Sequence, residues 1–409
     1  MIVINKRMIL FELFVVIMFF CQFRMEMRQG YILLFLELSI GCIYWLWKSK
    51  RLKQFTPLFL TYLFFITYRI VLSLMISGEG IKSIFYKELG MLFLCTLMLG
   101  ENTKIDVIKR VRDFGFINAL LGCYEFFTHS SIFLPYIAVK SRMFTQSLGT
   151  YRTRVQSVFM HPIICGVFMV VVWLCVLFFP YRKQLLNYLA RISIFLCLLG
   201  TQSRSSWIAF VLVNTIYIIK KRKGKGIRLK KSNVAQACAV VFLTLIIVII
   251  FNEYIKHICQ IVVSRWMSGM NSNDAGNYNR VTMIKMGIQE WMKLGIGKKI
   301  FGSGNGYAYT FLFNHPIRGW SGAVDNQYLT VLLDFGLVGF MMLIFMIAYI
   351  LKKIFTCGDN INQLCGLSIL SMFISGFFYE MFSWITVSLL FCLFLCILEQ
   401  ENREKERYV

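Results

Sequence analysis

Long apolar runs alternate with short polar connections along most of the 409-residue chain. A helix needs roughly 20 mostly apolar residues to cross the hydrocarbon core of a bilayer, and by that criterion we predict about twelve transmembrane helices. They lie near residues 8–23, 31–47, 57–77, 83–100, 114–132, 162–180, 187–202, 205–219, 234–252, 326–350, 363–380 and 383–398. The seventh and eighth runs are short and are compatible with a single hairpin.

The composition agrees with this pattern, because 58% of the residues are hydrophobic and only five are proline. We therefore predict an all-α, polytopic protein of the cell membrane. The thirteen cysteines fall almost entirely inside the apolar runs, so we expect small buried side chains rather than disulfides. The four histidines lack metal-binding spacing, and no nucleotide-binding motif occurs, so we expect neither a metal nor another cofactor.

Positive charge is concentrated beside the ends of the predicted spans. The formal net charge is +24, and more than half of the 44 Lys and Arg residues fall in segments that a cytoplasmic N-terminus would place inside the cell. This bias predicts that both termini are cytoplasmic. The densest basic run, 220–225, adjoins a span, so anionic lipid headgroups explain it and we expect no nucleic-acid partner.

Two connections on the predicted outer side are longer than the others, at 133–160 and 253–325. They divide the chain into N-terminal helices (1–132), central helices with the first outer loop (133–252), an extracytoplasmic segment between the ninth and tenth spans (253–325), and C-terminal helices with a cytoplasmic tail (326–409). A transporter built from inverted repeats has similar halves and short connections. The long outer segment and the lack of internal repetition favour an extracytoplasmic active site instead.

A polar turn between two apolar runs carries the first candidate side chain, Arg204. The turn reads Thr201-Gln202-Ser203-Arg204-Ser205-Ser206-Trp207, and it lies on the predicted outer side. An arginine there opposes the positive-inside tendency, and a preorganised guanidinium is a ready ligand for phosphate. The alternative is an interfacial anchor.

The extracytoplasmic segment contains three further features. Apolar residues at 281, 284, 288 and 291 predict an amphipathic helix on the membrane surface, with Asn277 or Asn279 near its cap and Arg280 at its outer end. Alternate glycines in 300–307 allow backbone amides to face either a ligand or a close-packed neighbour. Asp325 meets the edge of the tenth span, where low dielectric makes a carboxylate a better base, although Asp325-Asn326 also suits a helix cap.

Charged residues inside predicted spans need a partner or a wet cavity. Glu12 or Glu37 is the expected structural partner of Arg69. Asp334 follows Asp325 by roughly two and a half helical turns, so we expect it to line the floor of a cavity.

Several motifs occur in the order found in a known family. They are Arg154 with His161-Pro162 and Gly166, Thr201-Gln202-Ser203-Arg204-Ser205, Arg280 with Trp291, Gly302-Ser303-Gly304, Asp325-Asn326-Gln327-Tyr328-Leu329, and Gly336-Leu337-Val338-Gly339. With these motifs the chain resembles the O-antigen ligase/polymerase superfamily over residues 110–345.

The resemblance implies a GT-C-like enzyme that acts on glycans carried by undecaprenyl diphosphate at the outer face of the membrane. Ligases of this kind pass the glycan to lipid A core or another acceptor, and polymerases pass a growing chain to the next lipid-linked repeat unit. The chain looks like a Wzy-type polymerase for capsule, exopolysaccharide or O-antigen. Its implied partners are the undecaprenyl-diphosphate-linked oligosaccharide, membrane lipids and a chain-length regulator.

Such a substrate assigns expected roles to the candidate residues. Arginines stabilise a diphosphate leaving group without a metal ion, and the candidates are Arg204 and Arg280, followed by Arg265 and Arg154. The accepting sugar hydroxyl needs a base, for which Asp325 is the first candidate and His315 the second. The candidates for a substrate-binding loop are Gly302, Gly304 and Asn326. Direct displacement at the anomeric carbon would invert its configuration.

The chain departs from the family pattern at one position. Family ligases typically carry His-Asn where this chain has Asp325-Asn326, and this difference favours a polymerase. Two alternatives remain: a ligase that uses another acceptor, and a flippase for lipid-linked oligosaccharides. A flippase should have charged residues along a central cavity and no long outer segment.

Overall fold

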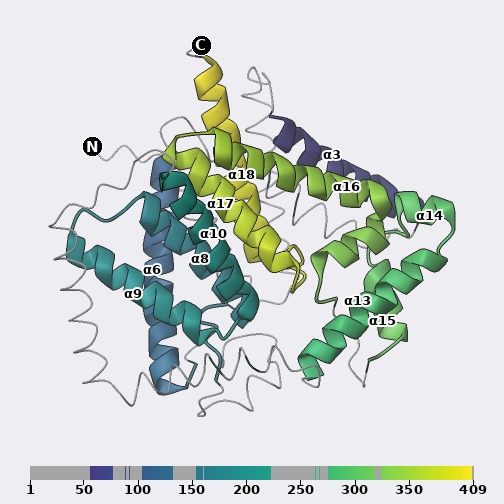
Figure 1. The fold of residues 1–409 in the computed structure, drawn as a ribbon, viewed down its shortest axis with the longest axis horizontal. Coiled ribbons are helices and arrows are strands. Elements are labelled where there is room, and N and C mark those ends of the chain that lie inside the picture. Colours follow the sequence, from purple (N-terminus) through teal and green to yellow (C-terminus); the bar gives the residue numbers. More distant parts are fainter. Residues whose placement is uncertain are drawn as a thin grey trace, which may run out of the picture.

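The computed structural model describes residues 56–76, 88, 92, 104–131, 153–159, 161–222, 263, 267, 275–317 and 324–407. Regular structure in this part of the chain is helical, without a β-strand, as the sequence predicts. The helices are α3 (Pro57–Ile76), α6 (Lys104–Thr128), α8 (Pro162–Phe178), α9 (Gln184–Gly200), α10 (Arg204–Arg222), α13 (Ala275–Lys293), α14 (Ile296–Phe301), α15 (Tyr307–Asn314), α16 (Gln327–Thr356), α17 (Asn360–Gly376) and α18 (Ile385–Arg407). Figure 1 shows α6, α8, α9 and α10 on one side, α13, α14 and α15 on the other, and α17 and α18 between them.

Most described helices coincide with predicted spans. Among the described residues, α3 and α16 are long and apolar enough to cross a membrane, and α8, α9 and Ile385–Glu399 are shorter apolar helices. The predicted seventh and eighth spans are the separate helices α9 and α10, joined by the turn 201–203. The runs 8–23, 31–47 and 234–252, and nearly all of 83–100, lie outside the described residues, so the number of spans stays a prediction.

Helix α8 forms the centre of the larger apolar core. It is apolar on every side, almost all of its residues are buried, and it packs against α6, α9, α10 and α17. A helix that is hydrophobic all round is stable only when neighbours cover it completely. Its N-terminal end is therefore held firmly, and His161 is the residue that caps it.

Helix α16 is broken at Gly336, whose φ of 62° is in the left-handed region. A Cβ at Gly336 would overlap backbone atoms of Ile300 and Gly302, and a Cβ at Gly302 would overlap the backbone of Asp334 and Phe335. Only glycine tolerates both the positive φ and this approach. The two glycines thus allow the loop after α14 to lie directly on the break in α16.

The break exposes carbonyl groups that other segments bind. The amides of Ser303 and Gly304 donate to the carbonyls of Leu333 and Asp334 at 3.1 and 3.0 Å, and the Tyr68 hydroxyl donates to the carbonyl of Phe335 at 3.2 Å. Buried carbonyls in a helix break need such partners. The loop after α14 is therefore hydrogen-bonded to the break in α16.

A second, smaller core lies under helix α13, which covers the helix predicted at 279–291. The buried face centres on Met283 and Gly287, and a Cβ at Gly287 would meet Leu329 of α16. Of the apolar residues in the predicted amphipathic pattern, Ile284 and Trp291 pack against this core, whereas Val281 and Ile288 are 52% and 39% exposed. The helix also begins at Ala275, so Asn277 and Asn279 lie inside it rather than at its cap. The close contact at Gly287 turns this face of the helix toward α16, and the spacing of apolar residues gives no sign of such a contact.

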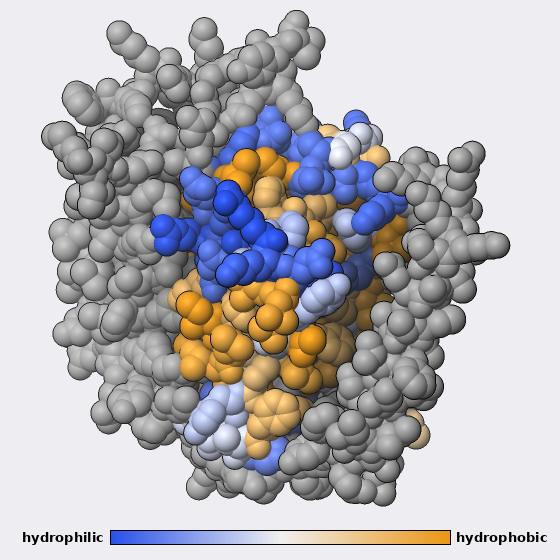
Figure 2. All heavy atoms as spheres, turned by 90° about the vertical axis from the view of Figure 1, so that its left-hand side faces the viewer, coloured by the Kyte–Doolittle hydropathy of each residue, from blue (hydrophilic) through white to orange (hydrophobic). Residues whose placement is uncertain are grey.

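The surface over α6 and α9 has the layering expected at a bilayer. Figure 2 shows a hydrophilic band on this side of the molecule, above a broad apolar belt. Lys109, Arg110 and Lys183 are exposed at one end of these helices. Ile117 of α6 and Ile192 of α9, both more than half exposed, lie further along. Basic residues beside an apolar belt are typical of a membrane interface.

Candidate functional site

The segment 153–159 lies against the turn between α9 and α10 and carries Arg154. The Val155 amide donates to the Gly200 carbonyl at 2.9 Å, and Arg154 Nε donates to the Thr201 carbonyl at 3.0 Å. On its other side, the segment is held by Glu125, whose Oε2 accepts from the amides of Gln156 and Ser157 at 3.0 and 2.8 Å. Arg154 and the start of α10 therefore share one corner of the protein.

The same corner contains the polar turn that includes Arg204. Ser203 Oγ lies 3.0 Å from Ser205 Oγ and 2.9 Å from Ser206 Oγ, and all three serines are buried. A Cβ at Gly166 of α8 would overlap the Ser206 side chain, so α8 and α10 cross closely here. Arg204 is the first residue of α10 and is partly exposed. The hydroxyl network fixes the backbone from which its side chain extends.

Arg280 and Asp325 form an ion pair, with Arg280 Nε 3.3 Å from Asp325 Oδ2. Their side chains are 28% and 17% exposed, which places the pair at an interface rather than in open solvent. Burial raises the pKa of Asp325 above its ordinary range, and the Arg280 guanidinium opposes that rise. The result is a carboxylate with increased proton affinity beside a permanent positive charge.

Asn326, rather than Asp325, caps α16. Asn326 Oδ1 accepts from the amides of Tyr328 and Leu329 at 3.0 Å each, and Nδ2 donates to the Phe377 carbonyl at 3.1 Å. Of the two interpretations of Asp325-Asn326, the capping role thus belongs to Asn326 alone. A role of Asn326 in substrate binding stays a prediction.

His161 lies in an aromatic stack formed with the turn between α17 and α18. Its ring stacks on Tyr379, with ring centroids 4.8 Å apart and planes 12° apart, and lies 5.5 Å from the Trp384 ring. Its Nδ1 accepts from the Ile163 amide at 3.3 Å. In the neutral ring this contact places the hydrogen on Nε2, which makes Nε2 a donor.

Two of the arginines act electrostatically on this histidine. Burial, followed by the positive charges of Arg154 and Arg280, lowers the pKa of His161 to about 3. Asp325, from its side, contributes with burial to a raised pKa of Tyr379. Arg154 and Arg280, two of the residues picked from the sequence, are thus within electrostatic range of one neutral imidazole, and a third, Asp325, is within range of the Tyr379 ring that stacks on it. A cluster of two guanidiniums and an N–H donor suits an anion such as phosphate.

The glycine-rich loop uses its amides within the protein. Gly302 donates to the Lys298 carbonyl at 2.7 Å, and Gly304 to the Asp334 carbonyl at 3.0 Å. The Gly306 and Ala308 amides donate to the Asp334 carboxylate at 2.9 and 2.8 Å. These amides therefore face a close-packed neighbour, which is one of the two alternatives that we considered. Binding of substrate by Gly302 and Gly304 stays a prediction.

Of the two remaining candidates, His315 lies apart from this cluster and Arg265 is not among the described residues. His315 is exposed at the end of α15, where its Nδ1 lies 2.9 Å from the carbonyl of Phe311 and its ring packs on the Phe311 ring.

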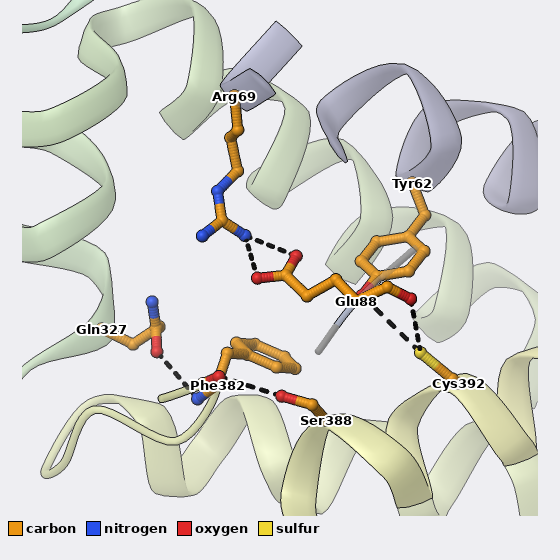
Figure 3. Close-up of polar contacts among 7 residues, drawn as sticks. All are labelled: Tyr62, Arg69, Glu88, Gln327, Phe382, Ser388 and Cys392. Carbon is orange, nitrogen blue, oxygen red and sulfur yellow. Dashed lines mark hydrogen bonds and ion pairs between the residues drawn. The ribbon is translucent and has the colours of Figure 1, made fainter. Parts of the chain in front are cut away.

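Beside Asp325 is a cavity of about 250 Å³. Val324 and Gln327, which flank Asp325 and Asn326, both line it, and Asp334 lines it as we expected. Figure 3 shows Arg69 and Gln327 directed toward the space that Glu88 and Phe382 border. The Phe382 amide donates to Gln327 Oε1 at 3.1 Å, which ties the α17–α18 turn to α16.

Arg69 has a partner that the sequence analysis did not name. Arg69 pairs with Glu88, which is 5% exposed, whereas we expected Glu12 or Glu37. Both expected residues lie outside the described part of the chain. Apolar runs reveal which charges need partners but not which helices are neighbours, and this pairing joins separate helices.

Sequence reasoning did not select the α17–α18 turn as part of the site. This turn contributes Tyr379, Glu380 and Trp384, which contact His161 or line the cavity. The available signal was the aromatic stretch 377–384, which contains Glu380 and straddles the short connection between the last two predicted spans.

Residues 189–344 match the family model described as O-antigen ligase. This match confirms the resemblance to the O-antigen ligase/polymerase superfamily. The family comprises membrane-integral enzymes of glycosyltransferase-like activity. The matched segment includes Arg204, Arg280 and Asp325, whereas Arg154, His161 and Tyr379 lie outside it. No curated protein matches the chain.

Proposed function

We propose that the protein polymerises oligosaccharide repeat units carried by undecaprenyl diphosphate at the outer face of the cell membrane, for capsule, exopolysaccharide or O-antigen. The observation that carries this proposal is the Arg280–Asp325 ion pair beside Arg154 and His161. It combines cations for a diphosphate with a carboxylate of raised pKa, which glycosyl transfer to a hydroxyl needs.

On the donor side, Arg154, Arg204 and Arg280 bind the diphosphate that leaves. Negative charge grows on its oxygens as the bond from the anomeric carbon breaks, and guanidiniums stabilise that charge without titrating. His161 remains neutral at physiological pH and donates from Nε2 toward the same anion. Because its pKa is about 3, it adds a hydrogen bond without accepting a proton from the acceptor.

On the acceptor side, Asp325 removes the proton from the attacking sugar hydroxyl. The hydroxyl oxygen forms the new bond to the anomeric carbon as the bond to the phosphate oxygen breaks, and the electron pair leaves with the diphosphate. The proton ends on the Asp325 carboxylate. A single displacement of this kind inverts the anomeric configuration, and it requires no metal ion.

A ligase is the second candidate, because the matched family model is described as O-antigen ligase. Against it, an aspartate stands where family ligases typically carry a histidine. The two functions share the donor chemistry and differ in the acceptor: a lipid-linked repeat unit for the polymerase, and another glycolipid, protein or wall polymer for the ligase.

The decisive experiment is product length in proteoliposomes supplied with a lipid-linked repeat unit. The intact protein should give a ladder of oligomers. Arg280→Ala should lower the coupling rate about 10²- to 10³-fold, the typical effect of removing one donor that stabilises an oxyanion. Arg204→Ala should abolish the ladder. Asp325→Asn, which keeps the shape of the side chain but removes the base, should give the lowest coupling rate of the three variants.

Lys285→Ala is the control, because Lys285 is exposed on the same helix as Arg280 and its loss removes one positive charge elsewhere. A single coupling to an added acceptor, without a ladder, would replace the polymerase with the ligase. Movement of the lipid between leaflets without coupling would replace both with a flippase. Retained anomeric configuration in the product would refute direct displacement.

A further inference from the structure

We propose that residues 292–301, the α14 tip, are embedded in the outer leaflet of the membrane and bind the phosphate groups of anionic phospholipids. The α14 tip comprises the end of α13 and all of α14. This inference does not rest on the proposed glycosyl transfer, because the tip begins about 18 Å along α13 from Arg280. It names a partner for a surface that the candidate site does not use.

The α14 tip exposes large apolar side chains. Met292, Ile296 and Phe301 are each more than half exposed, and Ile300 is exposed as well. No residue of α14 is buried, although the helix lies against α16. Four such side chains in so short a segment form an apolar patch of the kind that marks a contact with a membrane or with another protein.

The tip lies beside α3, which is long and apolar enough to cross the membrane. The Tyr68 hydroxyl of α3 donates to the Phe301 carbonyl, and Figure 1 shows α14 beside the ends of α3 and α16. From Tyr68 to the end of α3 at Ile76, which the predicted topology places outside, is about 12 Å along the helix. Leu74 and Met75, in these last turns, are more than half exposed. The tip therefore lies alongside turns of α3 that expose apolar residues, rather than beyond the end of that helix.

Three lysines give the tip a positive charge that it does not balance itself. Lys293, Lys298 and Lys299 lie in the tip, and no acidic residue occurs from 291 to 303. In the described part of the chain, none of these lysines has an ion pair or a side-chain hydrogen bond. Glu290, the nearest acidic residue in the sequence, accepts a hydrogen bond from the Tyr307 hydroxyl at 2.5 Å. The tip therefore needs an external anion.

The combination of apolar and positively charged side chains selects an anionic phospholipid. The stem of a lysine can lie along apolar surface while its ammonium group reaches the headgroups. Helices that expose both apolar residues and lysines bind in the interface of a membrane, and each positive charge strengthens the attraction to anionic lipid. A lipid without net charge would cover the apolar residues of the tip but leave its three ammonium charges unbalanced, and an apolar protein surface would do the same.

Bimane fluorescence in proteoliposomes tests the contact with lipid. The fluorophore is attached to Ile296→Cys in the full chain, and the parent protein measures the labelling of native cysteines. Ile117→Cys of α6 is the control, because Ile117 is also more than half exposed and no lysine or arginine lies within four positions of it. The vesicles consist of phosphatidylcholine with a small fraction of either phosphatidylcholine or phosphatidylglycerol that carries a quenching nitroxide on its acyl chain.

We expect both labelled positions to be quenched by lipid. Only at Ile296→Cys should the phosphatidylglycerol quench about fivefold or more effectively than the phosphatidylcholine, which is the factor for one lysine near an anionic surface. Equal quenching by the two lipids at Ile296→Cys would overturn the proposed phosphate contact. Quenching of this position by aqueous iodide but not by either lipid would overturn the embedding itself.

Removal of the lysines separates this contact from a general attraction of anionic lipid to the protein. The double variant Lys298→Gln/Lys299→Gln should lower the preference for phosphatidylglycerol at Ile296→Cys at least threefold. Lys109→Gln/Lys183→Gln, which removes two exposed positive charges beside α6 and α9, should leave that preference unchanged. An equal loss in both double variants would contradict the proposal. Loss of the preference when undecaprenyl diphosphate is added in an amount equimolar with the protein would assign the lysines to a substrate diphosphate and overturn the phospholipid as partner.

Discussion

Asp325 experiences two opposing influences on its proton affinity. Burial favours the neutral carboxylic acid, and the Arg280 guanidinium favours the carboxylate. The net effect is a raised pKa, so Asp325 keeps its proton to a higher pH than an exposed aspartate. Coupling activity that depends on the carboxylate as base therefore appears as the pH rises through the raised pKa of Asp325, and is lost as the pH falls below that pKa.

At this scale we predict that Arg280→Ala moves the acid limb of the kcat–pH profile to higher pH. The physical reason is that Arg280 lowers the pKa of Asp325, so its removal leaves burial unopposed. The measurement is the residual coupling rate of the variant across the acid range. Lys285→Ala should keep the limb of the intact protein, and a limb that does not move in Arg280→Ala would exclude Asp325 as the titrating base.

Helix α16 owes its shape to a pair of glycines as much as to its apolar residues. At the break, a Cβ at Gly336 would overlap backbone atoms of Ile300 and Gly302, a Cβ at Gly302 would overlap the backbone of Asp334 and Phe335, and both glycines have positive φ. Three carbonyls of the broken turn are satisfied by Ser303, Gly304 and Tyr68. The Asp334 carboxylate, bound by two loop amides, adds a contact between side chain and backbone.

At the scale of this element, we expect Gly302→Ala to destabilise the protein by about 2 kcal/mol or more, because a strained left-handed residue alone costs about 1–3 kcal/mol. Overlap with the Asp334 carbonyl adds to that strain. The measurement is the midpoint of thermal unfolding in detergent.

Gly297→Ala is the matched control for this substitution. A Cβ at Gly297 meets nothing within 4 Å, and the residue lies inside α14. Alanine is the better helix former by roughly 0.5–1 kcal/mol, so this midpoint should stay the same or rise slightly. An equal loss in both variants would contradict the interlock of the two glycines.

The elements show where prediction from the sequence succeeds. Apolar runs located α8, α9, α10 and α17 well, because burial in a helical bundle leaves a strong hydrophobic signal. The break at Gly336 left no such signal, since it depends on the approach of Gly302 from a distant segment.

The residues of the site also divide into those that the sequence could predict and those that it could not. Arg154, Arg280 and Asp325 were accessible as charged residues on the predicted outer side, and the structure brings them together. The roles of Tyr379 and Glu88 could not be predicted from the sequence. Tyr379 stacks on His161 and Glu88 pairs with Arg69, and the sequence does not show that these distant segments are neighbours. The sequence allowed either Asp325 or Asn326 to cap α16, and the hydrogen bonds of the structure show that Asn326 is the cap.

The molecule as a whole separates its charges by location. Basic side chains lie beside the apolar belt of α6 and α9, while the Arg280–Asp325 pair and the neighbouring cavity lie next to the α17–α18 turn. The proposed function requires Asp325 to face outward. It follows that the connection between α16 and α17 faces the cytoplasm.

Labelling of introduced cysteines tests this orientation. Asn314→Cys, exposed at the end of α15, should react with a membrane-impermeant maleimide in intact spheroplasts. Gly358→Cys, placed between α16 and α17 where a Cβ meets nothing, should react only after permeabilisation. The parent protein measures the background from the native cysteines. The reverse pattern would invert the predicted topology.

The interlock of Gly302 with Gly336 also limits how this protein can diversify. A recombination point between the two positions would combine one ancestor's loop with another's helix break, and any side chain at either position would collide with the opposing backbone. Exchanges that leave a working enzyme should therefore cross over before α14 or after the break, and carry both glycines together. The loop, the break and the Asp325 between them are then inherited as a single block.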